Sequence, residues 1–449
     1  MEKDLTKGSV LKNILLFSLP YLLSYFLQTL YGMADLFIIG QYEPVAATTA
    51  VSVGSQVMHM LTVMIVGLAM GSTVAIAQAV GAGDRARASG CVGNTVTLFL
   101  ALSVVLTAAL LLLLVGPIVR VMATPQEAVA GAQAYLRICF AGIPFIVAYN
   151  ILASIFRGMG DSKSPLYFIF VACAANIALD YLFIGAMHMG PAGAALGTTL
   201  AQAVSVAVSL LVILRRRAIR VSARDLRPQR GIMGQILRVG VPVTLQDGFI
   251  QVSFVVITII ANHRGLIDAA AVGIVEKIMG FLFLFPSTLL SSVSAIGAQN
   301  LGAGKPARVT QTLRYAVWMA LGFGAVVTAV VEFAAAPMVG LFTPDALVVA
   351  AGAQYLRGYV LDSCFGGVQF SFSGYFCARG KSGLSFLHNF LSIVLVRIPG
   401  AYLASKLFPQ TLFPMGLASA AGSLFSILVC VIAYAIVRRN DRKEGLYAA

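Results

Sequence analysis

Charged side chains are scarce in this sequence. Only 11% of the 449 residues are Asp, Glu, Lys or Arg, whereas 59% are hydrophobic. A water-soluble domain carries roughly 25% charged residues, so this chain has too few of them to cover a surface that faces water. The mean hydropathy of +0.90 agrees with that reading. The composition therefore disfavours a soluble enzyme, a disordered protein and a small disulfide-linked scaffold.

Cysteine and histidine are also few, and neither shows the spacing of a metal site. The six cysteines lie in or beside apolar runs and no pair has CxxC spacing, so we interpret them as small packing residues. The four histidines are scattered along the chain. We expect no bound cofactor and find no combination of nucleophile and base that would indicate an integral-membrane enzyme.

Long apolar runs, in contrast, recur along the whole chain. A helix needs about 20 mostly apolar residues to cross a bilayer. The Gly/Pro-containing stretch 187–193 separates the fifth run from the sixth. We predict an all-α integral membrane protein with twelve transmembrane helices. The predicted spans are 14–39, 48–78, 92–115, 132–156, 166–186, 193–214, 235–261, 267–299, 311–334, 350–376, 385–406 and 413–437.

The basic residues predict the orientation of these spans. If both termini are cytoplasmic, the inner segments hold 24 of the 31 Lys and Arg residues, and the outer loops and spans hold seven. Such an excess of positive charge on the cytoplasmic side is typical of membrane proteins. We therefore predict a multi-pass protein of the cell membrane with both termini inside. The net charge of +14 then needs no nucleic-acid partner.

The sequence also repeats itself at an offset near 220 residues. AQAVGAGDRAR (77–87) matches AQNLGAGKPAR (298–308), FRGMGDSKS (156–164) resembles CARGKSG (377–383), and Pro20 corresponds to Pro242. Neither Gly-Ala-Gly segment fits a phosphate-binding loop, so we interpret both as tight cytoplasmic turns between helices.

The duplication predicts two lobes of six spans each. Residues 1–214 form the first lobe, 215–234 a basic cytoplasmic linker, and 235–449 the second lobe. Because six is even, both halves point the same way. We expect the lobes to be related by a pseudo-two-fold axis along the membrane normal, with a binding site between them near the midplane.

A few acidic residues lie within the apolar spans, where an ionisable group costs roughly 2.5–3.5 kcal/mol. Asp35 lies deep in the first span and Asp180 in the fifth. Asn176 precedes Asp180 by four residues, so the two share one helix face, and Thr198 begins the sixth span. These oxygen-rich groups suit a monovalent cation, or the carboxylates could share a proton.

The second lobe has no acidic counterpart of Asp35. We predict that polar, aromatic and thioether side chains from both lobes line a substrate cleft, and that Arg397 pairs with an acid or a carbonyl group. We also predict that Pro20 is a hinge of the first helix, because proline removes one backbone hydrogen bond. The predicted cleft residues are Tyr31, Met64, Asp247, Gln251, Glu276 and Gln369.

Taken together, these features resemble the multidrug and toxic compound extrusion (MATE) family over about residues 10–438. The first-lobe set resembles the DinF-like branch, whose cation site uses an Asp on the first helix and an Asn–Asp pair on the fifth. The resemblance implies that Asp35, Asn176, Asp180 and Thr198 bind the coupling cation, as metal ligands if it is Na⁺. The NorM-like branch relies instead on a glutamate of the seventh helix, where this chain has Gln251. The segments that carry the resemblance are the two AQ-x-x-GAG copies, RGMGDSKSP, and the spans around Pro20, Asp35, Asn176, Asp180 and Thr198.

We therefore expect a secondary active exporter that exchanges Na⁺ or H⁺ for organic, often cationic, compounds by rocking of two lobes, and that works as a monomer in the bilayer. The main alternative is a flippase for a lipid-linked precursor, which would favour a cationic cavity. The spans hold mainly acids, with Arg397 the chief exception. A membrane enzyme and a passive channel are further alternatives.

Overall fold

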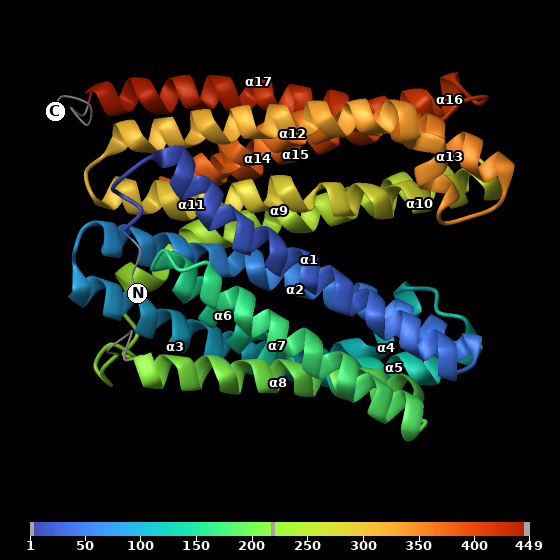
Figure 1. Cartoon of the computed structure of the whole chain (residues 1–449), viewed down its shortest axis with the longest axis horizontal. Coiled ribbons are helices and arrows are strands. Elements are labelled where there is room, and N and C mark those ends of the chain that lie inside the picture. The colour runs from blue at the N-terminus through green and yellow to red at the C-terminus, as the bar shows by residue number, and fades with distance from the viewer. Residues whose placement is uncertain (1–3, 217–220, 444–449) are drawn as a thin grey trace. The chain divides into compact units, whose positions relative to one another are not determined.

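The computed structural model describes residues 4–216 and 221–443, and every regular element in these ranges is helical. Residues 217–220 of the predicted linker lie outside the described part. Figure 1 labels the helices in chain order. The first half contains α1 (Val10–Tyr42), α2 (Val45–Gly81), α3 (Arg85–Ala109), η1 (Leu110–Leu114), α4 (Val115–Val121), α5 (Gln126–Ala141), α6 (Ile143–Gly158), α7 (Lys163–Asp180), η2 (Tyr181–Ala186) and α8 (Gly190–Arg216). The second half contains α9 (Arg230–Asn262), α10 (Leu266–Leu282), α11 (Leu284–Gly302), α12 (Pro306–Gly340), α13 (Ala346–Tyr359), α14 (Asp362–Ala378), α15 (Ser382–Ser392), η3 (Ile393–Arg397), α16 (Ile398–Leu407) and α17 (Phe413–Lys443).

Each of the twelve predicted spans coincides with one helix or with helices that follow one another directly. Within the described residues, ten helical segments are long and apolar enough to cross a membrane, and the pair α5–α6, bent by 49°, makes an eleventh. The tenth predicted span, 350–376, is divided between α13 and α14 and does not meet that criterion. Its break follows Tyr359, just before the polar residues that start α14.

Packing divides the chain into two compact units. Unit 1 consists mainly of Leu19–Leu237, and unit 2 combines Leu5–Ser18 with the chain from Arg238 onward. Both boundaries fall inside a helix, because α1 passes from unit 2 to unit 1 and α9 passes from unit 1 to unit 2. The predicted lobes are divided at the linker instead. The sequence did not indicate that the first residues of α1 and α9 belong to a different unit from the rest of each helix.

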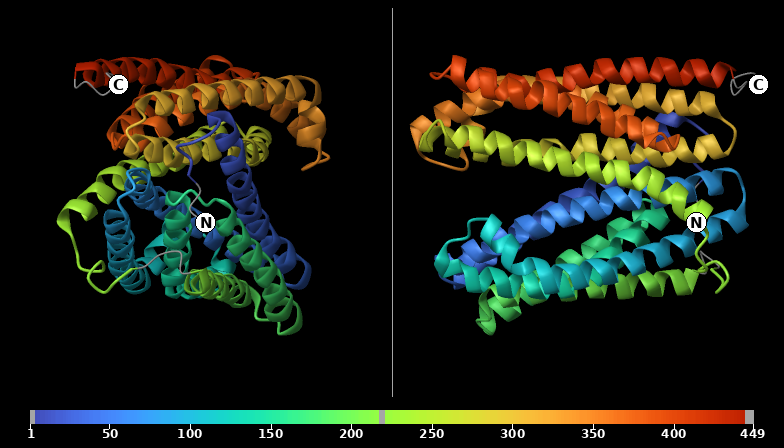
Figure 2. Two further views of the ribbon diagram at one scale, coloured as in Figure 1. Left: turned by 60° about the vertical axis from the view of Figure 1, so that its left-hand side comes forward. Right: turned by 180° about the vertical axis from the view of Figure 1, so that it is seen from behind.

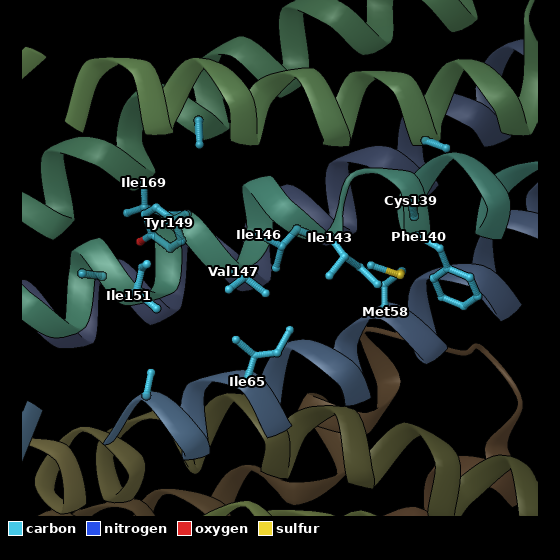
Figure 3. Close-up of a cluster of buried hydrophobic side chains, with 14 of the residues drawn as sticks. Met58, Ile65, Cys139, Phe140, Ile143, Ile146, Val147, Tyr149, Ile151 and Ile169 are labelled. Carbon is cyan, nitrogen blue, oxygen red and sulfur yellow. The ribbon is translucent and has the colours of Figure 1, made fainter. Parts of the chain in front are cut away.

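Each unit is a bundle of helices around its own apolar interior. In unit 1, α7 lies along α8 and α2 packs against α5 and α6, and in unit 2, α14 packs against α11 and α12. Figure 2 shows from two further sides that the helices within a unit run alongside one another. Figure 3 shows part of the unit 1 interior, where Met58 and Ile65 of α2 face Ile143, Ile146 and Val147 of α6.

Large apolar side chains also cover the outside of the bundles. Phe333 is 91% exposed and Trp318 67%. Exposure of so many large apolar side chains would be unfavourable in water, whereas a lipid environment accommodates it. The distribution is that of a multi-pass membrane protein.

The sequence repeat appears in the backbone as well. Gly160 and Gly380, which correspond in the two copies of the RG-containing segment, adopt φ angles of +85° and +68°. Both glycines end a helix in the left-handed conformation, which residues with a side chain rarely adopt. The repeated segments therefore form the same helix-ending turn in each half.

Candidate functional site

The four residues predicted to couple transport to a cation meet inside unit 1. Asp35 comes from α1, Asn176 and Asp180 from α7, and Thr198 from α8. Asp35 is 2% exposed, Asn176 1% and Asp180 0%, so both carboxyl groups are removed from water. The first helix and two helices more than a hundred residues later in the chain thus bring these side chains together, as their chemistry suggested.

Asp35 is at the centre of this group, which we call the acidic cluster. The Thr198 hydroxyl donates a hydrogen bond to Asp35 Oδ2 over 3.0 Å. The side chains of Asp180 and Asn176 also lie close enough to the Asp35 carboxyl group to interact with it. Asn176 and Asp180 reach it together because residues four apart on a helix lie on one face.

Much of the hydrogen-bonding capacity of the cluster is unused. Asp35 Oδ1, both carboxyl oxygens of Asp180 and both polar side-chain atoms of Asn176 are buried without a hydrogen-bond partner. Leaving buried polar atoms unpaired costs free energy, about 1–3 kcal/mol for each group. A bound cation, or a proton shared between the carboxylates, would satisfy the oxygen atoms of this group, whereas Asn176 Nδ2 is a donor and needs an acceptor.

The donor set fits a small monovalent ion. It supplies carboxylate, amide and hydroxyl oxygens, which hard cations prefer. Within the described ranges, no three His, Cys, Asp or Glu side chains gather as a metal site, so the cluster is unlike the ligand sets of zinc and other transition metals. Binding of Na⁺ or H⁺ by these oxygens stays a prediction.

No basic side chain neutralises the cluster through an ion pair in the described part of the chain. Arg157 of α6, although buried, binds elsewhere. Its Nη1 donates to the Tyr21 hydroxyl over 2.7 Å, and its guanidinium lies 4.4 Å from the centre of the Tyr21 ring. Among the described residues, the two buried carboxyl groups therefore lie together without an ion-paired counter-charge.

The backbone near Asp180 allows α8 to lie very close to α7. The α-helical pattern of α7 ends at Asp180 and continues as the π-helical segment η2, a wider helix that occurs often at functional sites. On the facing helix, Gly197 packs directly against the Asp180 carboxyl oxygen Oδ1, and a Cβ at this position would overlap that atom. Glycine at 197 thus allows α8 to lie against the acidic cluster.

Sequence reasoning missed several neighbours of the cluster. Tyr135 and Cys139 of α5 are buried and lie near Asp35, and Gln202 of α8 lies near Tyr31. The spacing of four residues between Thr198 and Gln202 could have identified Gln202 as a member of the same helix face. Nothing local in the sequence indicates that α5 packs here.

In unit 2 the predicted polar residues are dispersed over several helices. Asp247 and Gln251 lie on α9, Gln369 is buried on α14, and Glu276 of α10 accepts a hydrogen bond from Thr258 over 3.3 Å. Tyr31 and Met64 belong to unit 1. The assignment of all six to one substrate cleft stays a prediction.

Arg397 makes its direct contacts with aromatic side chains, and its pairing with an acid stays a prediction, because Asp362 and Glu276 lie near enough to interact with its charge. Its Nη2 donates to the Tyr359 hydroxyl over 2.7 Å and its guanidinium lies 4.9 Å from the Phe254 ring centre, with no carboxylate in ion-pair range among the described residues. A phenol and an aromatic face can hold a guanidinium through a hydrogen bond and a cation–π contact.

Comparison with known sequences gives matches over the whole chain. The MatE family model matches residues 20–182 and 242–403, one segment in each half. The probable multidrug resistance protein YpnP of Bacillus subtilis (strain 168) is 29% identical over 431 residues, which cover 96% of this chain and 96% of that protein. The probable multidrug resistance protein YoeA of the same strain is 30% identical over 76% of this chain and 75% of that protein.

Solved structures show the same fold. A crystal structure of MATE in the straight conformation matches with a TM-score of 0.89 and 23% identity, over 99% of this chain and 99% of that chain. The outward-facing conformation of a multidrug resistance MATE family transporter of the MOP superfamily has the same TM-score and identity, over 99% of this chain and 98% of that chain. The predicted fold class, an all-helical membrane protein with twelve transmembrane helices in two lobes, is confirmed.

Proposed function

The chain belongs to the multidrug and toxic compound extrusion family, a family of transporters rather than enzymes, and from this premise we propose that it is a secondary active exporter. It exchanges Na⁺ or H⁺ for organic compounds that are often cationic. Relatives with export in their names, such as the multidrug export protein MepA of Staphylococcus aureus (strain MRSA252), which is 24% identical over 409 residues, support this class of activity. We assign the chain to the DinF-like branch and to the cell membrane, as a monomer with both termini cytoplasmic.

The observation that carries the coupling proposal is the acidic cluster. Asp35 and Asp180 are almost completely buried, lie next to each other and have no ion-paired base in the described chain. Two adjacent carboxylates in a low-dielectric pocket repel each other strongly when both are charged. Binding one cation relieves that repulsion, and losing the cation restores it, so the cluster can both take up and release an ion.

The cycle that follows uses the inward gradient of the coupling ion. The ion enters from outside and binds the acidic cluster, the lobes then rock to expose the opposite side, and the organic substrate leaves. One charge that crosses 100 mV supplies about 2.3 kcal/mol, which corresponds to roughly fifty-fold accumulation. We propose Pro20 as the hinge of this change, and its position inside α1, the helix that carries Asp35, supports this role.

Replacement of Asp35 tests the coupling. We expect Asp35→Asn to abolish gradient-driven efflux of an ethidium-like dye from proteoliposomes, because an amide cannot alternate between a charged and a neutral or ion-bound form. Sodium and proton gradients are imposed separately, so the experiment also identifies the ion. Glu127→Gln is the matched control, since Glu127 is exposed in the first turn of α5 and should leave efflux unchanged. Undiminished efflux by Asp35→Asn would contradict the proposal.

A further inference from the structure

The two Gly-Ala-Gly segments have the same shape, and each holds another part of the chain. We call residues 77–87 and 298–308 the docking turns. Gly83 and Gly304, the last glycine of each, have the same φ of +70°, and the residue after each glycine donates its backbone N–H to the carbonyl five residues earlier. This left-handed helix ending is the conformation that glycine favours.

In unit 2 the docking turn binds the start of the chain, Leu5–Ser18, which we call strap 1. Gln299 Oε1 accepts the backbone N–H of Leu5 over 2.8 Å, and Asn300 Nδ2 donates to the Leu5 carbonyl over 3.3 Å. Arg308 Nη1 donates to the Gly8 carbonyl over 3.0 Å. Leu5 is 1% exposed, so this residue of the strap is buried in the protein and does not lie on its surface.

Further contacts extend this attachment along strap 1. Lys305 Nζ donates to the Thr6 carbonyl over 2.9 Å. Ser18 Oγ donates to Ser292 Oγ of α11 over 2.8 Å, at the other end of the strap. The cationic donors bind backbone carbonyls, and hydrogen bonds to charged groups are stronger than those between neutral groups.

In unit 1 the other docking turn binds the segment Ser222–Leu237, which we call strap 2. Gln235 Nε2 donates to Gln78 Oε1 over 2.8 Å, and Arg87 Nη2 donates to Gln235 Oε1 over 3.1 Å. Asn94, about two turns further along α3 than the docking turn, donates to the Asp225 carbonyl over 3.2 Å and accepts the backbone N–H of Gln229 over 2.7 Å. The part of the predicted linker that is described is therefore attached and not a free tether.

The same two positions of the repeat make these contacts in both halves. Gln78 corresponds to Gln299 and Arg87 to Arg308 in the duplicated segments. Each docking turn uses this Gln–Arg pair to hold the start of a helix, α9 in unit 1 and α1 in unit 2, and each of these helices then continues into the other unit. The proline of each helix follows soon after the boundary, Pro20 in α1 and Pro242 in α9. If the segments served only as tight turns between helices, a Gln and an Arg at equivalent positions of both copies would not be needed.

We propose that the docking turns are attachment sites for the helix starts of the opposite half and that the two attachments couple the units mechanically during transport. This inference rests on the proposed export function. Because strap 1 moves with unit 2 while the rest of α1 belongs to unit 1, movement of one unit is transmitted to a helix of the other. The Gln–Arg pairs are therefore positioning residues for transport, although they are remote in sequence from the acidic cluster.

The test combines Asn300→Ala with Arg308→Gln, which removes the side-chain contacts of the docking turn to the Leu5 and Gly8 carbonyls and leaves the contact of Asn13 with Leu5 in place. Backbone hydrogen exchange within strap 1 should become at least tenfold faster. Dye turnover in proteoliposomes should fall at least fivefold while the dye dissociation constant stays within twofold. Arg314→Gln is the matched control, because Arg314 is an exposed arginine of α12 that stacks near Tyr315 and not on the strap. It should change neither quantity.

A second variant, Gln235→Leu, examines the other copy and guards against a folding defect of the double variant. Gln235 is only partly buried, and its replacement should speed exchange in strap 2 and lower turnover in the same way. Faster hydrogen exchange in the straps of the variants together with wild-type dye turnover would overturn the mechanical role. Hydrogen exchange as slow as in the wild-type protein would overturn the attachment itself. A wild-type protein that exports no dye would refute the proposed function instead, and the exchange measurement would still decide the attachment.

Discussion

At the scale of single residues, the site depends on how closely α8 approaches Asp180. Gly197 has no side chain, and the Asp180 Oδ1 atom occupies the space where a Cβ would lie. A protein interior is packed too tightly to absorb such an overlap without a shift of the carboxylate or of the helix.

We predict that Gly197→Ala weakens binding of the coupling ion at least tenfold, because the displaced Asp180 carboxylate no longer faces Asp35. Ion-dependent protection against thermal unfolding, measured over a range of Na⁺ concentrations and pH values, reports this affinity. Gly116→Ala is the control, since no atom lies within 4 Å of a Cβ at that position. Equal ion affinity in both variants would mean that the close approach has no role.

The residue scale also shows what could be read from the sequence. Asp35 and Asp180 were predictable because a carboxylate in an apolar span is costly and therefore informative, and Asn176 followed from helical spacing. Tyr135 and Gly197 were not predictable from composition, since a tyrosine and a glycine are ordinary in a membrane helix. Tyr135 is a neighbour of the cluster only because α5 brings it near Asp35, and Gly197 only because α8 packs against α7.

At the scale of elements, one arginine fixes the turn after α9. Arg264, whose side chain is 7% exposed, binds Asp268 through Nε over 2.7 Å. Its two terminal nitrogens donate to four backbone carbonyls in the last turn of α16 and in the segment that follows it, at Ser405, Phe408, Pro409 and Thr411. The planar guanidinium can reach these groups simultaneously, whereas an ammonium group cannot.

Arg264→Lys should therefore destabilise the protein although charge is conserved. We expect a loss of about 2–4 kcal/mol, since several hydrogen bonds to a charged group disappear and their carbonyls are left partly unpaired. Thermal unfolding in detergent measures the effect. Arg120→Lys changes an exposed arginine and should leave the melting temperature within error. Similar melting temperatures for the two variants would disprove this role.

The elements themselves were largely predictable. All twelve apolar runs are helical, because a long apolar stretch in lipid must satisfy its own backbone hydrogen bonds. The π-helical segments η1, η2 and η3 and the division between α13 and α14 were not foreseen, because they depend on which side chains pack against the helix at that point. A π-helical segment or a break within a span does not change the hydropathy of the sequence, so hydropathy cannot reveal it.

At the scale of the whole molecule, the duplicated sequence gives two units that each enclose their own core. The repeat predicted the two halves but not that α1 and α9 start in one unit and end in the other. A hydropathy pattern locates helices along the sequence but does not show which distant residues they contact. The straps are held by contacts between residues more than a hundred positions apart, such as Leu5 with Gln299 and Gln78 with Gln235. Long-range polar contacts of this kind are invisible to a count of spans.

The proposed transport cycle depends on exchange between the coupling ion and the organic substrate. If the acidic cluster takes up an ion when the substrate leaves, substrate binding and ion binding must oppose each other. The coupling free energy is then reciprocal, so each ligand weakens the other by the same factor. Asp35→Asn should remove this antagonism while the protein remains folded.

The most direct measurement is ion release from the purified protein when a cationic dye binds, followed with a pH indicator for H⁺ and with radioactive sodium for Na⁺. The account predicts about one ion released for each dye molecule bound by the wild-type protein and none by Asp35→Asn. Dye binding by the wild-type protein without release of either ion, or equal release from the variant, would contradict it.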